Sequence, residues 1–402
     1  MQEYNKKKTG ASWHPFFFVY VVFSLYLCSV KKPLLYEISV IRPLVIFLLV
    51  VYHALCVFTG GWQAPPGVHE NGVYWWLGRL ISGFRIETIA FVGGYVFCYQ
   101  CVETGRRTGL LPFVWKKFKR LIVPCFVFGI AFYALFCYRP ERFRLYVAFW
   151  RVANGVSHLW FLPMLFWCFL TCWLLDRLLD WLSRRHSAWL PWTGRALLAV
   201  LAGVSLLRVT GLRMGLSRAS YFMFYFYLGY WLRYELFVLR RPRHAGDRRG
   251  WLAAALWVLY AVLLLLHLQA THLRLPGFGF DCPHWLRGCS RVTLRLMALG
   301  HTTCGLLALY ATVTLWLRRH REQGAQPSAW LRECSRLCYG VYVLHMFFLQ
   351  WLYYYSPVPA WCCGTAAGAW LMPWGVLAVT LALSAGGTWL LLQSRTGRFL
   401  IG

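Results

Sequence analysis

Long apolar runs, separated by short polar segments, recur along this chain from residue 38 to residue 393. About 20 consecutive apolar residues suffice for a helix that crosses the hydrocarbon core of a membrane. Because water is absent there, the backbone must satisfy its own hydrogen bonds, and a helix does so. The pattern predicts spans at residues 38–58, 84–101, 121–138, 159–182, 195–210, 220–238, 251–269, 294–317, 337–354 and 371–393. We therefore predict an all-α polytopic membrane protein of about ten transmembrane helices.

The composition also indicates a membrane protein. Of the 402 residues, 59% are hydrophobic and 14% are charged, whereas about a quarter of a soluble chain is charged. No stretch is long and polar enough for a separate soluble domain, so residues 36–402 are predicted to form one membrane domain after an N-terminal extension at 1–35. Residues 13–30 of that extension are apolar, and we expect an interfacial or partly inserted helix there, since an eleventh span would place the lysines at 6–8 outside the cell.

The basic residues predict the orientation of the helices. The segments that follow the second, fourth, sixth, eighth and tenth spans hold about twice as many lysines and arginines as the alternate segments. Basic loops stay on the cytoplasmic side, so both ends of the membrane domain are expected in the cytoplasm. The net charge of +29 is then explained by helix orientation and by contact with anionic membrane lipid. No basic soluble module exists to bind nucleic acid, and we expect no nucleic-acid partner.

Arg42 and His53 are the most informative pair of residues. An ionisable side chain inside a membrane helix is costly, so it marks a candidate functional site. His53 lies eleven positions after Arg42, and at about 100° per residue their directions on the helix agree to within about 20°. Both can therefore face one cavity, about 16 Å apart along the helix axis.

The second span holds another ionisable residue, Glu87, close to Arg85. Residues two apart on a helix do not face each other, so Glu87 is expected to have its partner on another helix, with Arg42 and His53 as candidates. A purely structural ion pair is an equally good interpretation. The glycines at 93 and 94 permit close helix packing.

Two further segments have both a functional and a structural interpretation. Lys117 and Arg120 lie on one helix face, where they could grip the phosphates of a nucleotide-like donor or simply anchor the helix at the cytoplasmic surface. His158 and Trp160 open the fourth span, and they could hold a sugar or form part of the interfacial aromatic belt.

The ninth span carries Tyr339, Tyr342 and His345 at intervals of three residues, on one helix face. That face is either a polar cavity lining or a hydrogen-bonded packing seam. The sequence contains one CxxC pair, Cys98 and Cys101, inside the apolar second span, and no further metal-ligand spacing accompanies it. We therefore expect no metal site and no permanently bound cofactor.

Taken in this order, the segments resemble the membrane-bound acyltransferase family 3, the polytopic O-acyltransferases of cell-surface carbohydrates. The resemblance runs from about residue 36 to the last span, and its most specific part is the arginine and histidine with ten residues between them. Lys117 stands where the family usually has an arginine, and lysine lacks the bidentate fork. The other matching segments are Ala90–Gly94, His158–Phe161, Phe226–Tyr230 and Tyr342–His345.

The resemblance implies transfer of an acyl group, with acetyl expected, from cytoplasmic acyl-CoA to a hydroxyl of an extracytoplasmic or lipid-linked glycan. It implies a multi-pass protein of the inner membrane of a bacterium, and an enzyme that transfers groups other than aminoacyl groups. His53 would act as the base or carry the acyl group as a nucleophile. The other implied roles are acyl-CoA binding by Arg42, Lys117 and Arg120, support of His53 or Arg42 by Glu87, acceptor binding by His158 and Trp160, and cavity lining by Arg85, Tyr339, Tyr342 and His345.

The alternative is a proton-coupled transporter or flippase for an anionic or lipid-linked sugar, since buried Arg, His and Glu would suit such a site too. Transporters often consist of two related halves, and the sequence shows no internal repeat. A third interpretation treats His53 as a hydrogen-bonded core residue of a scaffold. Some members of the resembled family carry a C-terminal esterase-like domain, and this sequence is expected to act alone or with a separate partner.

Overall fold

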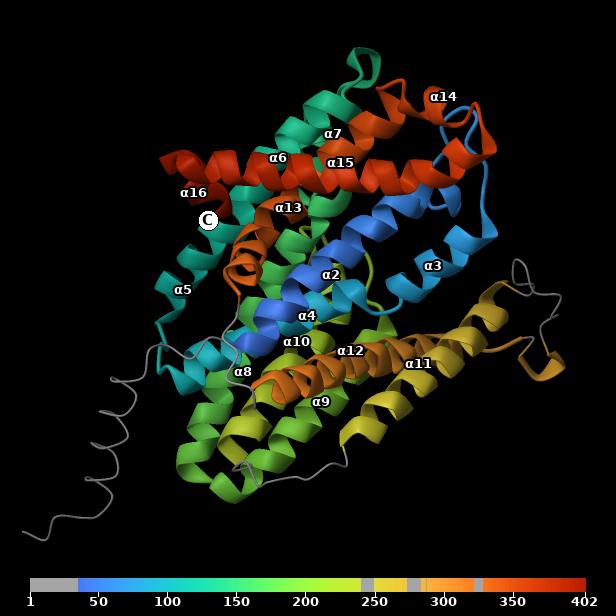
Figure 1. Ribbon diagram of the computed structural model, residues 1–402. Coiled ribbons are helices and arrows are strands. Elements are labelled where there is room, and N and C mark those ends of the chain that lie inside the picture. The colour runs from blue at the N-terminus through green and yellow to red at the C-terminus, as the bar shows by residue number, and fades with distance from the viewer. Residues whose placement is uncertain (1–34, 240–248, 273–282, 287, 322–327) are drawn as a thin grey trace, which may run out of the picture. The chain divides into compact units, whose positions relative to one another are not determined.

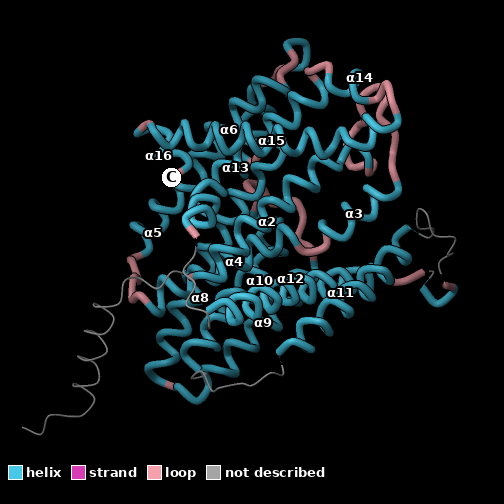
Figure 2. Tube along the Cα trace, viewed as in Figure 1, coloured by secondary structure: helices cyan, strands magenta, loops and turns pink. Residues whose placement is uncertain are grey.

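The computed structural model describes residues 35–239, 249–272, 283–286, 288–321 and 328–402. The apolar segment at 13–30 lies outside the described residues. The chain divides after Tyr36, and the account below concerns residues 37–402. Figures 1 and 2 show that helices make up nearly all of this part, and no strand occurs among its described residues.

Each predicted span corresponds to a helix. Eight helical stretches in the described ranges are long and apolar enough to cross a membrane, which confirms an all-α polytopic membrane protein. Two helices, α10 and α13, are outside that set because tyrosines and charged residues lower their hydropathy, so the number of spans stays a prediction. The helices are α2 (Tyr36–Leu55), α4 (Arg85–Cys98), α6 (Val123–Phe132), α8 (Phe161–Arg185), α9 (Leu190–Leu207), α10 (Leu216–Tyr234), α11 (Arg249–His272), α12 (Arg291–Arg321), α13 (Ala329–Tyr354) and α15 (Ala366–Gln393).

The third helical stretch begins at Leu110, before the apolar run predicted at 121–138. Helix α5 (Leu110–Lys117) continues through the π-helical turn η3 (Phe118–Ile122) into α6, and the π-helical turn η4 (Tyr133–Cys137) ends the stretch. Lysine and arginine are good helix formers, so the basic residues extend the helix instead of preceding it.

Several shorter helices join the long ones. Helix α3 (Gly72–Ser82) precedes α4, and the side chain of Asn71 caps it by accepting the N–H groups of Val73 and Tyr74. The others are α7 (Leu145–Ala153), α14 (Val358–Cys362) and α16 (Arg395–Ile401).

Helices α2, α6 and α13 run in the same direction. Just before α6 begins, the carbonyl of Arg120 accepts a hydrogen bond of 2.9 Å from the hydroxyl of Tyr339, in the first half of α13. Toward their ends, the hydroxyl of Tyr353 donates to the carbonyl of Ala54, and the rings of Phe136 and Tyr355 lie 5.5 Å apart. The contacts therefore place the start of α6 beside the first half of α13, and the ends of α2 and η4 beside the end of α13.

Helices α4 and α10 cross in close contact at glycines. A Cβ atom added to Gly94 would lie 1.8 Å from the carbonyl oxygen of Phe226, and one added to Gly229 would lie 2.0 Å from that of Phe91. Each helix thus presents a glycine to the backbone of the other, so only glycine fits. The predicted close packing at Gly94 is confirmed, and the Phe226–Tyr230 run supplies its partner surface.

A partly buried ion network fixes the beginning of α2. The guanidinium of Arg233, in α10, binds the carboxylate of Glu103 with an Nη2–Oε2 distance of 2.6 Å and lies 3.3 Å from Glu37 Oε1. The hydroxyl of Tyr95 donates to Glu37 at 2.7 Å. Because breaking one member of such a network leaves a charge unpaired away from water, the network holds α2 against α4 and α10.

We expect Gly94→Ala and Gly229→Ala each to lower the free energy of unfolding by about 2 kcal/mol or more, because the added methyl group pushes two backbones apart. Gly386→Ala in α15 is the matched control, since a Cβ there meets no atom within 4 Å. The measurement is the thermal unfolding midpoint of each purified variant in the same detergent. Equal midpoints for all three variants would contradict the close crossing.

Candidate active site

Three histidines from separate parts of the chain meet inside the helix bundle. His53 lies near the end of α2, His345 lies in the middle of α13, and His158 lies in the 3-10 turn η6 (Ser157–Trp160) that leads into α8. His53 Nδ1 is 3.0 Å from His345 Nε2. The ring of His158 packs edge-on against that of His345, with 4.9 Å between the centroids.

Hydrogen bonds fix which nitrogens of these rings carry protons. His345 Nδ1 faces two backbone carbonyls, those of Tyr342 at 2.6 Å and Val341 at 3.2 Å. A nitrogen between two acceptors must be the N–H donor, so in the neutral ring Nε2 has the lone pair. His345 Nε2 then accepts from the N–H of His53 Nδ1. His53 Nε2 keeps its own lone pair, and no hydrogen bond within the described part of the chain occupies it.

The ring of His53 is held from both sides. His345 and His53 have nearly parallel ring planes, inclined by 13°, which suits an in-plane hydrogen bond. The indole of Trp62 stacks on His53 with an interplanar angle of 17° and 5.7 Å between the centroids. The sequence did not single out Trp62, because it lies in a loop after α2 where only the fold brings it back over the histidine.

A buried cation lies close to the histidines. Arg85 is 5% exposed, and its guanidinium carbon lies 3.5 Å from the centroid of the Tyr52 ring. Its charge acts electrostatically on His53. Arg85 Nε has no hydrogen-bond partner among the described residues. The structure therefore places a positive charge with an unused donor beside the candidate reaction centre.

Glu87 faces away from the histidines. Its carboxylate accepts a hydrogen bond from the hydroxyl of Tyr221 in α10 at 3.3 Å, and it interacts electrostatically with Arg85. No hydrogen bond or ion pair joins it to the expected partners, Arg42 and His53, within the described ranges. Helix periodicity explains this outcome, because a residue two positions after Arg85 points about 200° away from it.

The three cations predicted to bind the acyl donor lie at one end of the bundle. Arg120 interacts electrostatically with both Lys117 and Arg42. The ammonium of Lys117 lies 3.3 Å from the ring centroid of Phe169 in α8, so its stem lies along α8. Arg120 itself is exposed. These residues come from α2 and from the α5–α6 stretch, and together they form a cationic surface.

His158 and Trp160 have different neighbours. His158 Nε2 donates to the carbonyl of Val343 in α13 at 2.9 Å. The guanidinium carbon of Arg218 instead lies 4.4 Å from the ring centroid of Trp160, and the Trp160 indole packs on Phe222 in α10. The structure thus brings His158, but not Trp160, into contact with the histidine cluster.

The tyrosines of the ninth predicted span favour the packing-seam interpretation. Tyr342 is buried and its hydroxyl donates to the carbonyl of His158 at 2.6 Å. Tyr339 likewise donates to the carbonyl of Arg120. Both tyrosines therefore hold α13 against the turns η6 and η3, while His345 on the same helix face contacts His53.

Comparison with known proteins gives one family. A family model described as an acyltransferase domain matches residues 35–392 of the chain. No curated protein and no solved structure matches it.

The hydrogen bonds predict that His53 is protonated on Nδ1 and bare on Nε2. Nitrogen NMR of protein labelled with ¹⁵N-histidine should show this state, with His53 assigned by its loss in His53→Gln. In His345→Phe the acceptor is gone, and the fixed state of His53 should be lost. The signal of the exposed His69 is the control and should not change. An Nε2-protonated His53 in the unaltered protein would contradict the assignment.

Proposed function

Since the chain belongs to the membrane-bound acyltransferase family 3, we propose that it transfers an acyl group, with acetyl expected, from acyl-CoA to a hydroxyl of an extracytoplasmic or lipid-linked glycan. The observation that supports the proposal most is the geometry of His53. Its Nδ1–H is held by His345, its ring is stacked by Trp62, and its Nε2 is bare. A base fixed in this way inside a membrane protein can act on a hydroxyl group without competition from bulk water.

In the proposed step, His53 Nε2 takes the proton of the acceptor hydroxyl as its oxygen attacks the thioester carbonyl. The tetrahedral intermediate collapses, the carbon–sulfur bond breaks, and His53 returns the proton to the CoA sulfur. His345 supports the imidazolium by accepting the Nδ1 hydrogen bond throughout. The buried guanidinium of Arg85 is proposed to stabilise the oxyanion, since a preorganised donor at a developing charge is effective in a dry site. Glu87 then balances Arg85.

The donor is proposed to bind through the cationic surface of Arg42, Lys117 and Arg120. Acyl-CoA carries several phosphates, and guanidinium groups bind phosphates through charge-assisted hydrogen bonds. Arg42 lies about 16 Å along α2 from His53, so the extended pantetheine arm would lead the thioester toward the histidines. Acyl-CoA is thus a substrate, and no permanently bound cofactor is proposed. We propose that this end faces the cytoplasm of a bacterium, and the larger number of basic residues in the segments on this side supports the orientation.

We expect His53→Ala to lower the release of CoA from acetyl-CoA by about 10²-fold or more, because the base is lost. The assay is performed on protein in lipid nanodiscs with the glycan acceptor, and modification of the acceptor is followed by mass spectrometry. His69→Ala, in an exposed loop, should keep the unaltered rate. A normal rate in His53→Ala would exclude the proposed mechanism. Movement of the glycan across the membrane without release of CoA would favour a transporter.

Arg120→Gln is expected to raise the KM for acyl-CoA by about tenfold, since one charged hydrogen bond to a phosphate is lost. The rate at saturating donor should change little. Lys119→Gln is the matched control, because it removes the same charge one residue away, where the ammonium lies 5.5 Å from the ring of Trp115. The two KM values are measured at the same ionic strength. Equal effects of the two substitutions would show that only the general surface charge matters.

A further inference from the structure

The chain between η4 and α8 is exposed over residues 138–147 and then returns into the protein, where Val152, Val156 and Leu159 are buried. Helix α7 runs back along α6, and the thiol of Cys125 lies 3.9 Å from the carbonyl oxygen of Val152 and 3.8 Å from that of Leu159. The turn after α7 therefore reaches the depth of the histidine cluster, where His158 contacts His345.

The loop between α9 and α10 reaches the same depth from the other side. The amide of Met214 donates to the side-chain oxygen of Asn154 at 2.6 Å, and the indole of Trp167 donates to the carbonyl of Met214 at 2.9 Å. A Cβ added to Gly215 would lie 2.6 Å from the backbone nitrogen of Met164. Non-helical backbone at membrane depth is tolerated only where it is buried in protein or lines a water-filled cavity.

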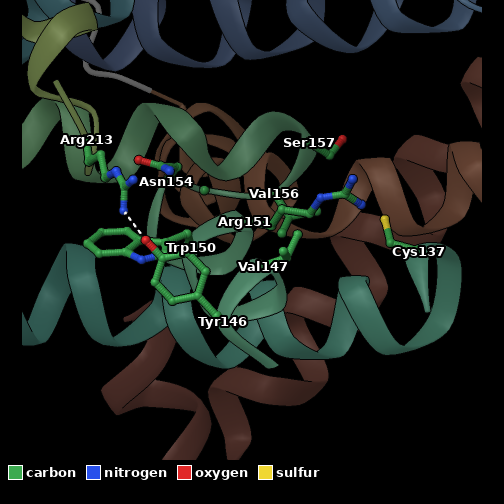
Figure 3. Close-up of a pocket in the computed structure, with 10 residues that line it drawn as sticks. Cys137, Tyr146, Val147, Trp150, Arg151, Asn154, Val156, Ser157 and Arg213 are labelled. Atoms are coloured by element: carbon green, nitrogen blue, oxygen red, sulfur yellow. Dashed lines mark hydrogen bonds between the residues drawn. The ribbon is translucent and has the colours of Figure 1, made fainter. Parts of the chain in front are cut away.

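A cavity of about 560 Å³ lies between these two segments. We call it the vestibule. Its volume is within the range of about 300–1,000 Å³ that is usual for ligand pockets. It lies at the end of the helices opposite to Arg42 and Arg120. Figure 3 shows its lining residues, which are Cys137, Tyr146, Val147, Trp150, Arg151, Asn154, Gly155, Val156, Ser157 and Arg213.

The vestibule is cationic. Arg151 and Arg213 lie at opposite ends of it (Figure 3), and none of the described residues that line it is acidic. The guanidinium of Arg213 donates to the hydroxyl of Tyr146 at 3.1 Å and lies 4.3 Å from the ring centroid of Trp150. This hydrogen bond from Arg213 also lowers the pKa of Tyr146. Arg213 is thus oriented in advance, while most of its donors stay available for a ligand.

Two of the three described non-glycine residues with a positive φ angle lie beside the vestibule. Ser157 and Met214 have φ angles of 53° and 54°, in the left-handed region that residues other than glycine rarely adopt. Ser157 lines the cavity directly before His158, and Met214 follows Arg213. Such conformations cost energy, persist only where the surrounding structure holds them, and are frequent at binding sites.

We propose that the vestibule binds an acidic oligosaccharide, whose carboxylates or phosphates are held by Arg151 and Arg213 while a neighbouring sugar presents its hydroxyl toward the histidine cluster. The inference rests on the proposed function and specifies its acceptor. Two separated guanidiniums fit an extended ligand with more than one negative group. Trp150 and Tyr146 add aromatic surface for sugar rings, and the turn at Ser157 joins the vestibule to His158.

The test is equilibrium binding without acyl-CoA, in nanodiscs of phosphatidylcholine. The probes are digalacturonic acid, its uncharged methyl ester and a disaccharide 1-phosphate. Binding of a carboxylate ligand and of a phosphate ligand is thus measured separately. We expect at least one acidic probe to bind about tenfold more tightly than the methyl ester. Arg151→Gln and Arg213→Gln should each remove most of this preference. Arg213→Lys should keep part of it, because the charge stays and the planar fork is lost.

Arg291→Gln is the matched control, because Arg291 lines a separate cationic cavity with Arg208, His267 and Arg295. It should bind all probes like the unaltered protein. Arg151 is exposed, and no hydrogen bond or ion pair from the described residues occupies it, so its substitution should not affect folding, as gel filtration can verify. Equal effects of Arg291→Gln and Arg151→Gln would overturn the assignment to the vestibule.

Two other outcomes would overturn the inference. Equal binding of acidic and methylated probes would show that the vestibule does not select anions, even if acyl transfer proceeds normally. Displacement of the probes by short-chain phosphatidylglycerol, with the same loss in Arg151→Gln, would assign the vestibule to a lipid headgroup. A preference for acidic probes, without release of CoA in any acceptor assay, would instead support binding of an acidic glycan in the vestibule. It would contradict the proposed acyl transfer.

Discussion

The hydrogen bond between His53 and His345 is the contact on which the arrangement of the site depends. It joins α2 to α13, whose participating residues are 292 positions apart in the chain. Polar groups inside a membrane protein are stable only when they are paired, so the two helices must keep His53 and His345 at the same depth. The backbone carbonyls beside His345 fix its proton, and that proton in turn determines which nitrogen of His53 is bare.

The site has a different character at each end. Arg42, Lys117 and Arg120 form a cationic surface where α2 and the α5–α6 stretch begin. At the other end, α7 and the loop before α10 border the vestibule, an open cationic pocket. The histidines lie between the two. Such an arrangement fits the proposed transfer, in which a water-soluble donor and a glycan approach one base from opposite sides.

Family membership is shown by most of the chain, whereas the proposed reaction depends on a few side chains. The family model covers nearly the whole membrane domain, which shows an acyltransferase of the membrane-bound family 3. The proposed reaction depends on a few contacts within it, chiefly those of His53, His345, Trp62 and Arg85. These side chains come from α2, α13, α4 and a loop. The Arg233 network and the α4–α10 glycine crossing hold α2 and α4 in place, and the His53–His345 hydrogen bond joins α2 to α13.

The sequence by itself determined the helices, the common face of Arg42 and His53, and the close packing at Gly94, because these follow from local hydrophobic periodicity and residue size. Tertiary structure alone decided that His345 is the partner of His53, that Trp62 covers it, and that Glu87 faces Tyr221 instead of Arg42. It also decided that α7 returns into the bundle. Pairing across hundreds of residues depends on how helices pack, and periodicity within one helix gives the direction of a side chain but not the helix that it meets.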